Sequence, residues 1–256
     1  IRRPPRSTRK ESSAASDVYK RQADALLGAG YGAAGERCMA ISVAVPVGED
    51  TADRLLEKLI PRVEALKVGP YTSGNDVDYG PVVTAAAKAN IERLVQTGLD
   101  QGAKLAVDGR NFNLQGYEDG FFVGAHLFDN VTKDMDIYKY EICGPVLSTV
   151  RAQSYEEALG LAMDHEYGNG TAIFTRDGDT ARDFANRVNV GMIGINVPIP
   201  VPLAYHTFGG WKKSVFGDLN QHGPDAFKFY TRTKTVTARW PSGLKEGGEF
   251  SIPIME

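Results

Sequence analysis

The chain has 256 residues, 42% hydrophobic and 24% charged, so it is long enough to bury a substantial core in one large or two small domains. Its formal net charge is −3, and no apolar run is long enough to span a bilayer, which excludes a transmembrane helix. The two cysteines form no disulfide framework. They suit a reducing compartment, which would be the cytoplasm or, in a eukaryote, the mitochondrial matrix.

Residues 1–22 differ in composition from the rest. They hold seven Lys or Arg and two acids, a net charge of +5, so residues 23–256 sum to −8. The acidic body argues against a nucleic-acid surface. The segment is rich in Arg and Ser and lacks apolar periodicity. The composition fits a mitochondrial transit peptide or a basic tail. We favour a third interpretation, that residues 1–22 are a foreign or disordered leader.

Small residues then lead to a single thiol, Cys38, and an apolar run over 39–45 follows it. Glycines let a ligand approach the backbone closely. A cysteine that begins a helix, with Arg37 beside it, would be favoured as thiolate. In isolation such a cysteine is more often a small buried hydrophobe. Residues 28–33 also fit the dinucleotide pattern G-x-G-x-x-A, but 23–27 are too short and too little β-branched to form the strand that this pattern requires.

The hydrophobic pattern beyond the thiol alternates between helical and extended periods. Apolar spacing of three and four predicts helices from Asp50, with Pro61 kinking or dividing the first, and from Thr84, Ser154 and Asp179. β-branched and aromatic runs predict strands, which fall at 104–107, 121–123, 127–128, 146–150, 171–175 and 192–196. Strands that alternate with helices predict an open α/β sheet.

Three later stretches carry functional information. Glu141 precedes Gly144-Pro145 and could accept hydrogen bonds from a ribose diol, although an exposed acid before a turn is the commoner case. Alternating prolines over 196–203 predict a stiff, extended segment that lines a pocket or simply connects two elements. The glycine-rich loop 208–217, which begins with Phe208, either lets backbone approach a ligand or is a surface turn.

Together, the thiol segment, the Glu141 segment and the Phe208-Gly209-Gly210 loop resemble, in the same order, the aldehyde dehydrogenase superfamily. The resemblance covers residues 23 to about 243. More narrowly, residues 35–40, 167–174 and 196–203 look like the CoA-acylating methylmalonate-semialdehyde dehydrogenases.

The resemblance implies a fold and a site. The fold would be an aldehyde dehydrogenase catalytic domain with an open twisted α/β sheet over 23–229 and an oligomerisation strand and tail over 230–256. The NAD-binding Rossmann domain of the family would be missing upstream. Cys38 would be the nucleophile, Arg37 the anchor of the substrate carboxylate, Phe208 a substrate contact and Glu141 a ribose ligand of NAD. Coenzyme A would be the co-substrate.

The implied reaction converts methylmalonate or malonate semialdehyde to propanoyl-CoA or acetyl-CoA with loss of CO2. Two alternatives stay open: hydrolysis of the thioester by a non-acylating NAD(P)-dependent relative, and an inactive fragment that keeps only an assembly surface. Cys143 departs from the family, which usually has Phe there, and this puts cofactor positioning in question. A cysteine hydrolase would need a histidine base, and none of the four histidines stands in a nucleophile–base motif.

The last predicted element is a strand over 229–240. Four threonines alternate with long or charged residues, and Pro241-Ser242-Gly243 would end the strand. An exposed edge at the end of a chain needs a partner or charged protection. The resemblance implies that this strand joins the sheet of a second subunit, in dimers that pair into tetramers. An ordinary edge strand shielded by Arg232, Lys234 and Arg239 is the alternative.

Overall fold

The computed structural model describes residues 8–238 and 240, and a four-stranded sheet with the order β1-β4-β3-β2 lies at its centre. β1 (Val43–Ala44) and β3 (His126–Asp129) run parallel to β4 (Val146–Thr149), whereas β2 (Lys104–Val107) is antiparallel to β3. The pairing of Leu127 with Leu147 and of Phe128 with Ser148 fixes the register between β3 and β4. Because side chains alternate along a strand, this register decides which face each residue covers.

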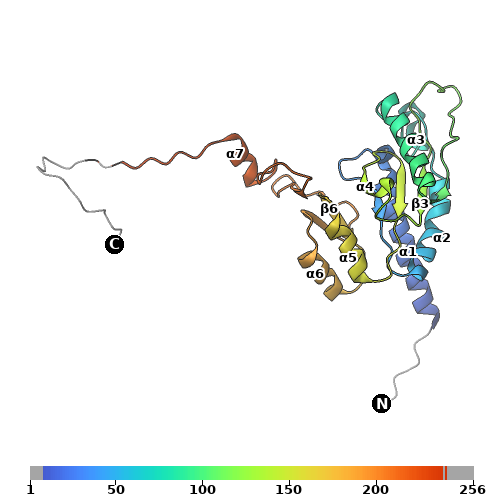
Figure 1. Ribbon diagram of the computed structural model, residues 1–256, viewed down its shortest axis with the longest axis horizontal. Coiled ribbons are helices and arrows are strands. Elements are labelled where there is room, and N and C mark those ends of the chain that lie inside the picture. The colour runs from blue at the N-terminus through green and yellow to red at the C-terminus, as the bar shows by residue number, and fades with distance from the viewer. Residues whose placement is uncertain (1–7, 239, 241–256) are drawn as a thin grey trace, which may run out of the picture.

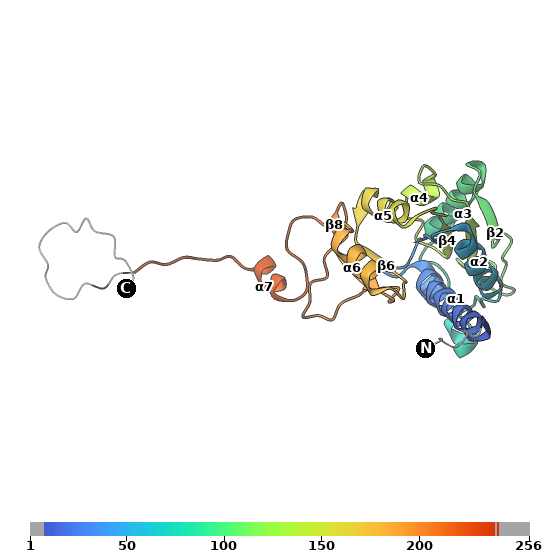
Figure 2. The same cartoon turned by 90° about the horizontal axis from the view of Figure 1, so that it is seen from below.

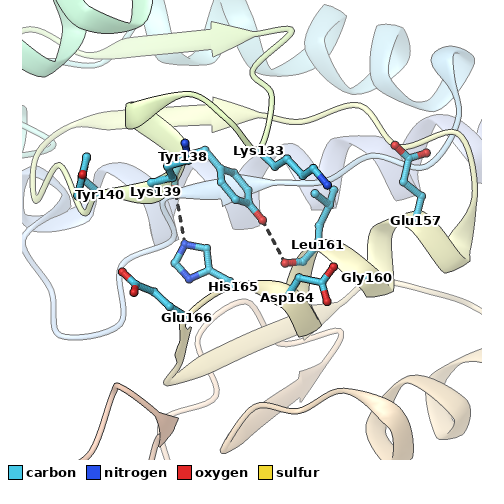
Figure 3. A pocket seen from close by; sticks show the side chains of 10 residues that line it. All are labelled: Lys133, Tyr138, Lys139, Tyr140, Glu157, Gly160, Leu161, Asp164, His165 and Glu166. Carbon is cyan, nitrogen blue, oxygen red and sulfur yellow. Dashed lines mark hydrogen bonds between the residues drawn. The ribbon is translucent and has the colours of Figure 1, made fainter.

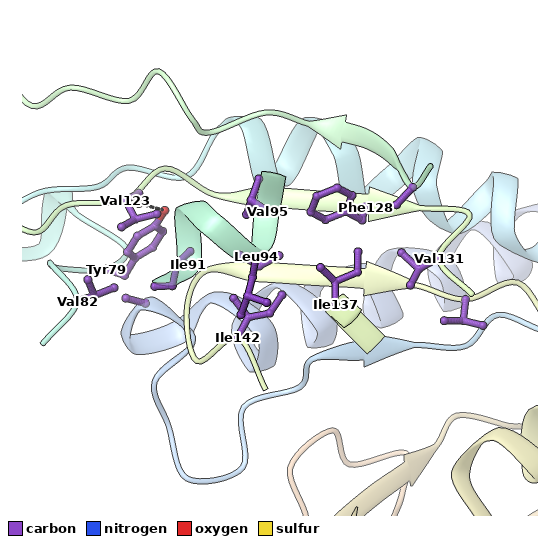
Figure 4. Close-up of a cluster of buried hydrophobic side chains, with 14 residues drawn as sticks. Tyr79, Val82, Ile91, Leu94, Val95, Val123, Phe128, Val131, Ile137 and Ile142 are labelled. Carbon is purple, nitrogen blue, oxygen red and sulfur yellow. Dashed lines mark hydrogen bonds between the residues drawn. The ribbon is translucent and has the colours of Figure 1, made fainter. Parts of the chain in front are cut away.

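Both faces of this sheet are covered by helices. Leu127 and Leu147 pack with α1 (Thr8–Tyr31) and α2 (Glu49–Glu64), which lie side by side in Figure 2. The opposite face, with Phe128, packs against α3 (Ala85–Asp100) in the cluster drawn in Figure 4. Ile91 of α3 has no exposed surface. The sheet is therefore the middle layer of three, and strands covered on both sides read as continuous apolar runs.

The carboxyl-terminal part contains two smaller sheets. β6 (Gly170–Ile173) pairs with β7 (Met192–Ile195) in parallel, and β5 (Tyr167–Gly168) pairs with β8 (Trp211–Lys212) antiparallel. Helices α5 (Tyr155–Asp164) and α6 (Gly178–Arg187) pack Leu159 and Phe184 onto the first of these sheets. Beyond α7 (Pro224–Tyr230), the described chain leads away from the body (Figure 1). The remaining elements are the 3-10 turns Gly32–Gly35 and Tyr71–Asp76 and the short helix α4 (Asp136–Lys139).

Polar side chains begin the predicted helices much as the sequence indicates. Thr84, Ser154 and Asp177 accept hydrogen bonds from the first-turn N–H groups of α3, α5 and α6. Such caps satisfy donors that the helix itself leaves unpaired. Pro61 lies inside α2 but does not divide it. The helix continues through Pro61 and ends about one turn later, at Glu64. Strands β2, β3, β4, β6 and β7 fall at the predicted positions to within a few residues.

The predicted boundary at residue 22 needs correction, because α1 begins at Thr8 and crosses it. The helix buries Ala23, Leu26 and Tyr31, and these contacts supply the costly nucleus from which a helix extends at little further cost. Residues 8–22 are therefore helical. Of the two alternatives that we predicted for residues 1–22, foreign or disordered, the foreign origin stays a prediction. The same helix places 23–27 outside any strand, which removes the structural context of the dinucleotide pattern.

Three other expectations were wrong in detail. The strands form three sheets instead of one open sheet. Residues 121–123 are not a strand, although Phe122 and Val123 are buried. Phe229 and Tyr230 belong to α7, and residues 231–238 form no ladder with any described residue. Arg239 and residues 241–243, which we expected to shield and end that strand, lie outside the described residues.

Candidate functional site

Cys38 lies exposed in a tight turn between the 3-10 turn Gly32–Gly35 and β1. It does not begin a helix as we predicted. The N–H of Ala40 donates to the carbonyl of Arg37 at 3.0 Å and closes the turn. The N–H of Cys38 itself has no acceptor among the described residues. A backbone donor beside an exposed thiol is the arrangement that stabilises an oxyanion formed on the carbon bound to sulfur.

The thiol turn rests against the Glu141–Pro145 segment. Gly35 has a φ of +72°, and a side chain there would collide with the carbonyl of Gly144. Only glycine tolerates both this backbone conformation and this approach. The contact brings together segments that are about a hundred residues apart in the sequence, and Glu36, next to Gly35, lies near enough to Cys143 for its charge to raise the pKa of that thiol.

Cys143 is exposed as well, but its surroundings are acidic. Partial burial raises the pKa of its thiol, and the charges of Glu141 and Glu36 raise that pKa further. A raised pKa leaves less thiolate at neutral pH, so Cys143 is a poorer nucleophile than an ordinary cysteine. Its φ of +53° also holds it in the left-handed region that non-glycine residues rarely adopt.

The two charged side chains among the predicted ligand-binding residues, Arg37 and Glu141, are exposed to solvent. The Arg37 guanidinium folds over Gly32, where a Cβ would lie 2.8 Å from Arg37 Cζ. Arg37 pairs with no described acid, and the Glu141 carboxylate has no hydrogen-bond partner among the described residues. An unpaired guanidinium can take a carboxylate by two parallel hydrogen bonds, and an unpaired carboxylate can accept from two hydroxyl groups.

Phe208 is half-buried and stands edge-on to His222, with 5.5 Å between the ring centroids. The glycines that follow pack tightly. A side chain on Gly191 would overlap the carbonyl of Gly209, and a Cβ on Gly210 would lie 3.2 Å from Asn169 Cα. The residue after Asn169, Gly170, in turn touches the Met39 side chain next to Cys38. The third predicted segment is thus linked to the thiol turn through Asn169 and Gly170.

A pocket of about 560 Å³ lies between α4 and α5 (Figure 3). Tyr138 donates to the carbonyl of Leu161 at 3.1 Å, and His165 stands edge-on to Tyr138. None of the four predicted site residues lines this pocket, and no cysteine does.

A cysteine hydrolase would need a histidine base beside its thiol. His126 is buried in β3, and burial lowers its pKa to about 4. His165 belongs to the pocket, and His222 packs on Phe208. None of the described histidines hydrogen-bonds to Cys38.

Two features of the site were not predicted from the sequence. Ala33 and Ala34 adopt φ values of +53° and +56°, so the strained turn before the thiol is carried by alanines as well as glycine. Strained backbone of this kind gathers at functional sites. Lys212 also has a φ of +54°, next to the Phe208 segment. No composition rule marks these positions, because neither residue type favours the left-handed region.

The thiol turn, the Glu141 segment and the glycine-rich loop match a known family. The model of the aldehyde dehydrogenase family matches residues 13–236, so the chain belongs to this family.

The chain is 57% identical over 232 residues to a malonate-semialdehyde dehydrogenase of Pseudomonas aeruginosa, covering 90% of this chain and 46% of that one. It is 50% identical to an acylating, mitochondrial methylmalonate-semialdehyde dehydrogenase of Arabidopsis thaliana, covering 85% of this chain and 35% of that one.

Solved structures agree. A protein of Sinorhizobium meliloti, provisionally named methylmalonate-semialdehyde dehydrogenase and crystallised with NAD, superposes with a TM-score of 0.86 at 69% identity. The match covers 88% of this chain and 46% of that one. The chain therefore spans less than half the length of these relatives. Among the described residues, no helix is both long and apolar enough to cross a membrane.

Proposed function

We propose that Cys38 is the nucleophile in the oxidation of malonate or methylmalonate semialdehyde to a coenzyme A thioester. The observation that carries the proposal is the Gly35–Gly144 contact, which joins the thiol turn to the Glu141 segment. The names of the relatives support the substrate class, and the Arabidopsis relative is named as acylating.

Each predicted side chain has a role in this proposal. Arg37 binds the substrate carboxylate, because its guanidinium is exposed and pairs with no described acid. Phe208, the first residue of the glycine-rich loop, contacts the apolar part of the aldehyde. Glu141 accepts hydrogen bonds from the ribose hydroxyls of NAD, and its exposed, unpaired carboxylate fits that diol. When bound, NAD would supply the hydride acceptor.

The thiol then acts in two stages. The Cys38 thiolate adds to the aldehyde carbon, and the backbone N–H of Cys38 donates to the oxyanion. After oxidation the acyl group is held as a thioester on Cys38. Its free carboxylate leaves as CO2, because the bonding electrons pass to the thioester carbonyl, and a solvent proton returns to the carbon. The thiol of coenzyme A takes the propanoyl or acetyl group and releases the Cys38 thiol.

The test measures NADH and acyl-CoA formation from each semialdehyde. It uses the 256-residue chain and the same chain joined behind the amino-terminal half of the Pseudomonas relative. We expect propanoyl-CoA or acetyl-CoA that is lost in Cys38→Ser. A free acid formed without coenzyme A would favour the hydrolytic alternative. No product from either protein would favour a chain that retains only an assembly surface.

The carboxylate role of Arg37 has its own test in the joined protein. Arg37→Leu should raise KM for carboxylated semialdehydes ten- to a hundredfold, because a hydrogen bond to a charged group contributes about 1.5–3 kcal/mol. Propanal, which has no carboxylate, is the matched control and should be nearly unaffected. An equal loss for both aldehydes would mean that Arg37 acts on the thiol instead.

We also propose that the chain self-associates, as a dimer or tetramer, through its carboxyl-terminal arm, residues 231–240. Phe227 and Tyr230 of α7 and Val236 of the arm are 77%, 79% and 75% exposed. A chain ending at Gly223 should lose self-association in light scattering after sizing. A chain ending at Trp240 should keep it. Equal subunit numbers in the two would mean that the arm has no role in assembly.

A further inference from the structure

Lys212 makes an unusually complete set of hydrogen bonds. Its ammonium donates to the carbonyls of Met163, His165 and Ala162 at 2.7, 3.0 and 3.3 Å. These carbonyls lie at the carboxyl end of α5, which ends at Asp164. The last carbonyls of a helix have no partner within the helix and carry its negative end. Three donors on one cation therefore meet three acceptors that nothing else in the helix satisfies.

The backbone of Lys212 adopts a conformation that residues with side chains disfavour. Lys212 has a φ of +54°, which residues with side chains rarely adopt, and the β5–β8 ladder contains only two residue pairs. The lysine stem packs over Gly168, where a Cβ would lie 3.3 Å from its Cδ. So short a ladder gives little cooperative support. The neighbouring residues add two hydrogen bonds, from the N–H of Lys213 to the carbonyl of Glu166 and from the N–H of Gly168 to Ser214 Oγ. The side chain of Lys212 is the contact that reaches the carbonyls of α5 itself.

The fastened strand directly follows the Phe208–Gly210 segment. Gly209 and Gly210 have no side chains with which to anchor themselves, and they lie against Gly191 and Asn169. Asn169 continues into Gly170, which touches Met39 beside Cys38. A displacement of β8 would therefore move Phe208–Gly210 relative to the thiol turn.

We propose that Lys212 is a positioning residue: by fastening β8 to the carboxyl end of α5, it holds Phe208–Gly210 at the distance from Cys38 that a carboxylated aldehyde requires. The inference rests on the proposed function, in which Phe208 contacts the aldehyde. Lys212 itself touches neither the aldehyde nor the thiol.

The neighbouring Lys213 offers a matched control. It pairs with the Glu166 carboxylate at 2.5 Å, but its side chain is 67% exposed. Exposed pairs of this kind contribute little. Lys213→Met thus removes the same charge one residue after β8 and leaves the hydrogen bonds to the carbonyls of Ala162, Met163 and His165 in place.

The experiment uses the 256-residue chain with Trp240→Phe, which leaves Trp211 as its single tryptophan. Time-resolved anisotropy reports the local motion of Trp211, the residue next to Lys212. We expect Lys212→Met to increase that motion clearly and Lys213→Met to leave it unchanged. The second readout is protection of Cys38 from iodoacetamide by malonate semialdehyde. We expect Lys212→Met to require about tenfold more aldehyde for half-protection.

Each outcome decides a different point. Unchanged Trp211 motion in Lys212→Met overturns the fastening, whether or not the aldehyde binds. Greater motion with unchanged protection overturns the positioning role. No protection even with Lys212 intact would contradict the proposed function and, with it, the role of Lys212 in the site. If Lys212→Met fails to fold by circular dichroism, Lys212→Arg, which keeps the charge but cannot aim three donors at one point, should show intermediate motion.

Discussion

The two thiol segments of this chain meet at Gly35 and Gly144 and yet have opposite character. Partial burial raises the pKa of the Cys143 thiol, and the nearby carboxylates of Glu141 and Glu36 raise that pKa further. Cys38 follows Arg37 in a turn whose N–H groups are partly unpaired. Two exposed cysteines in adjoining turns can therefore be suited to different tasks, because partial burial and the charges around a thiol both shift its pKa and hence its reactivity.

The contact between the two turns can be broken most directly at Gly35. Gly35→Ala should lower the free energy of unfolding by about 2–4 kcal/mol, because an alanine at a φ of +72° is strained and would also strike Gly144. Urea denaturation measures the change. Gly28→Ala is the control, since a Cβ there meets nothing within 4 Å and alanine favours helix α1 by up to about 1 kcal/mol. Equal stability of the two variants would contradict the contact.

The support beneath the Cys143 turn is a second point of attack. Ile91 of α3 is fully buried and lies directly under Gly144. Ile91→Ala should cost about 2–4 kcal/mol, because it removes buried methyl groups and leaves a cavity. Ile195→Ala, at a side chain 46% exposed, should cost far less. Thermal unfolding of both variants tests this difference. Similar melting temperatures would mean that the packing of Ile91 under Gly144 contributes little to stability.

Much of this arrangement follows from local patterns. The apolar runs around Leu127 and Leu147 predict buried strands, and the caps at Thr84 and Ser154 predict the starts of two helices. The approach of Gly35 to Gly144 could not be predicted, because it depends on how the chain packs over about a hundred residues. The helical state of residues 8–22 escaped prediction for a similar reason, since it extends from buried contacts at Ala23 and Leu26. The left-handed alanines before Cys38 contradict local preference altogether.

The acidic surroundings that distinguish Cys143 from Cys38 can be made less acidic by substituting Glu36. Glu36→Gln should lower the pKa of Cys143, so that its alkylation begins at lower pH and its rate at neutral pH rises a few-fold. The change is partial because burial, the largest cause, remains. The pH–rate profile of Cys143, measured in a Cys38→Ser background, reports it. Glu64→Gln on α2 is the control and should leave the profile unchanged. If Glu36→Gln leaves the pH–rate profile of Cys143 unchanged, the charge of Glu36 does not contribute to the difference between the two thiols.

The most direct measurement is competitive alkylation of the folded chain with a limiting amount of iodoacetamide at neutral pH, followed by peptide mapping. Both cysteines are exposed, so the reagent can reach each of them. We predict that the adduct forms mainly on Cys38, because partial burial and the carboxylates of Glu141 and Glu36 disfavour the thiolate of Cys143. Labelling that is equal at both sites, or faster at Cys143, would contradict the assignment of Cys38 as the nucleophile.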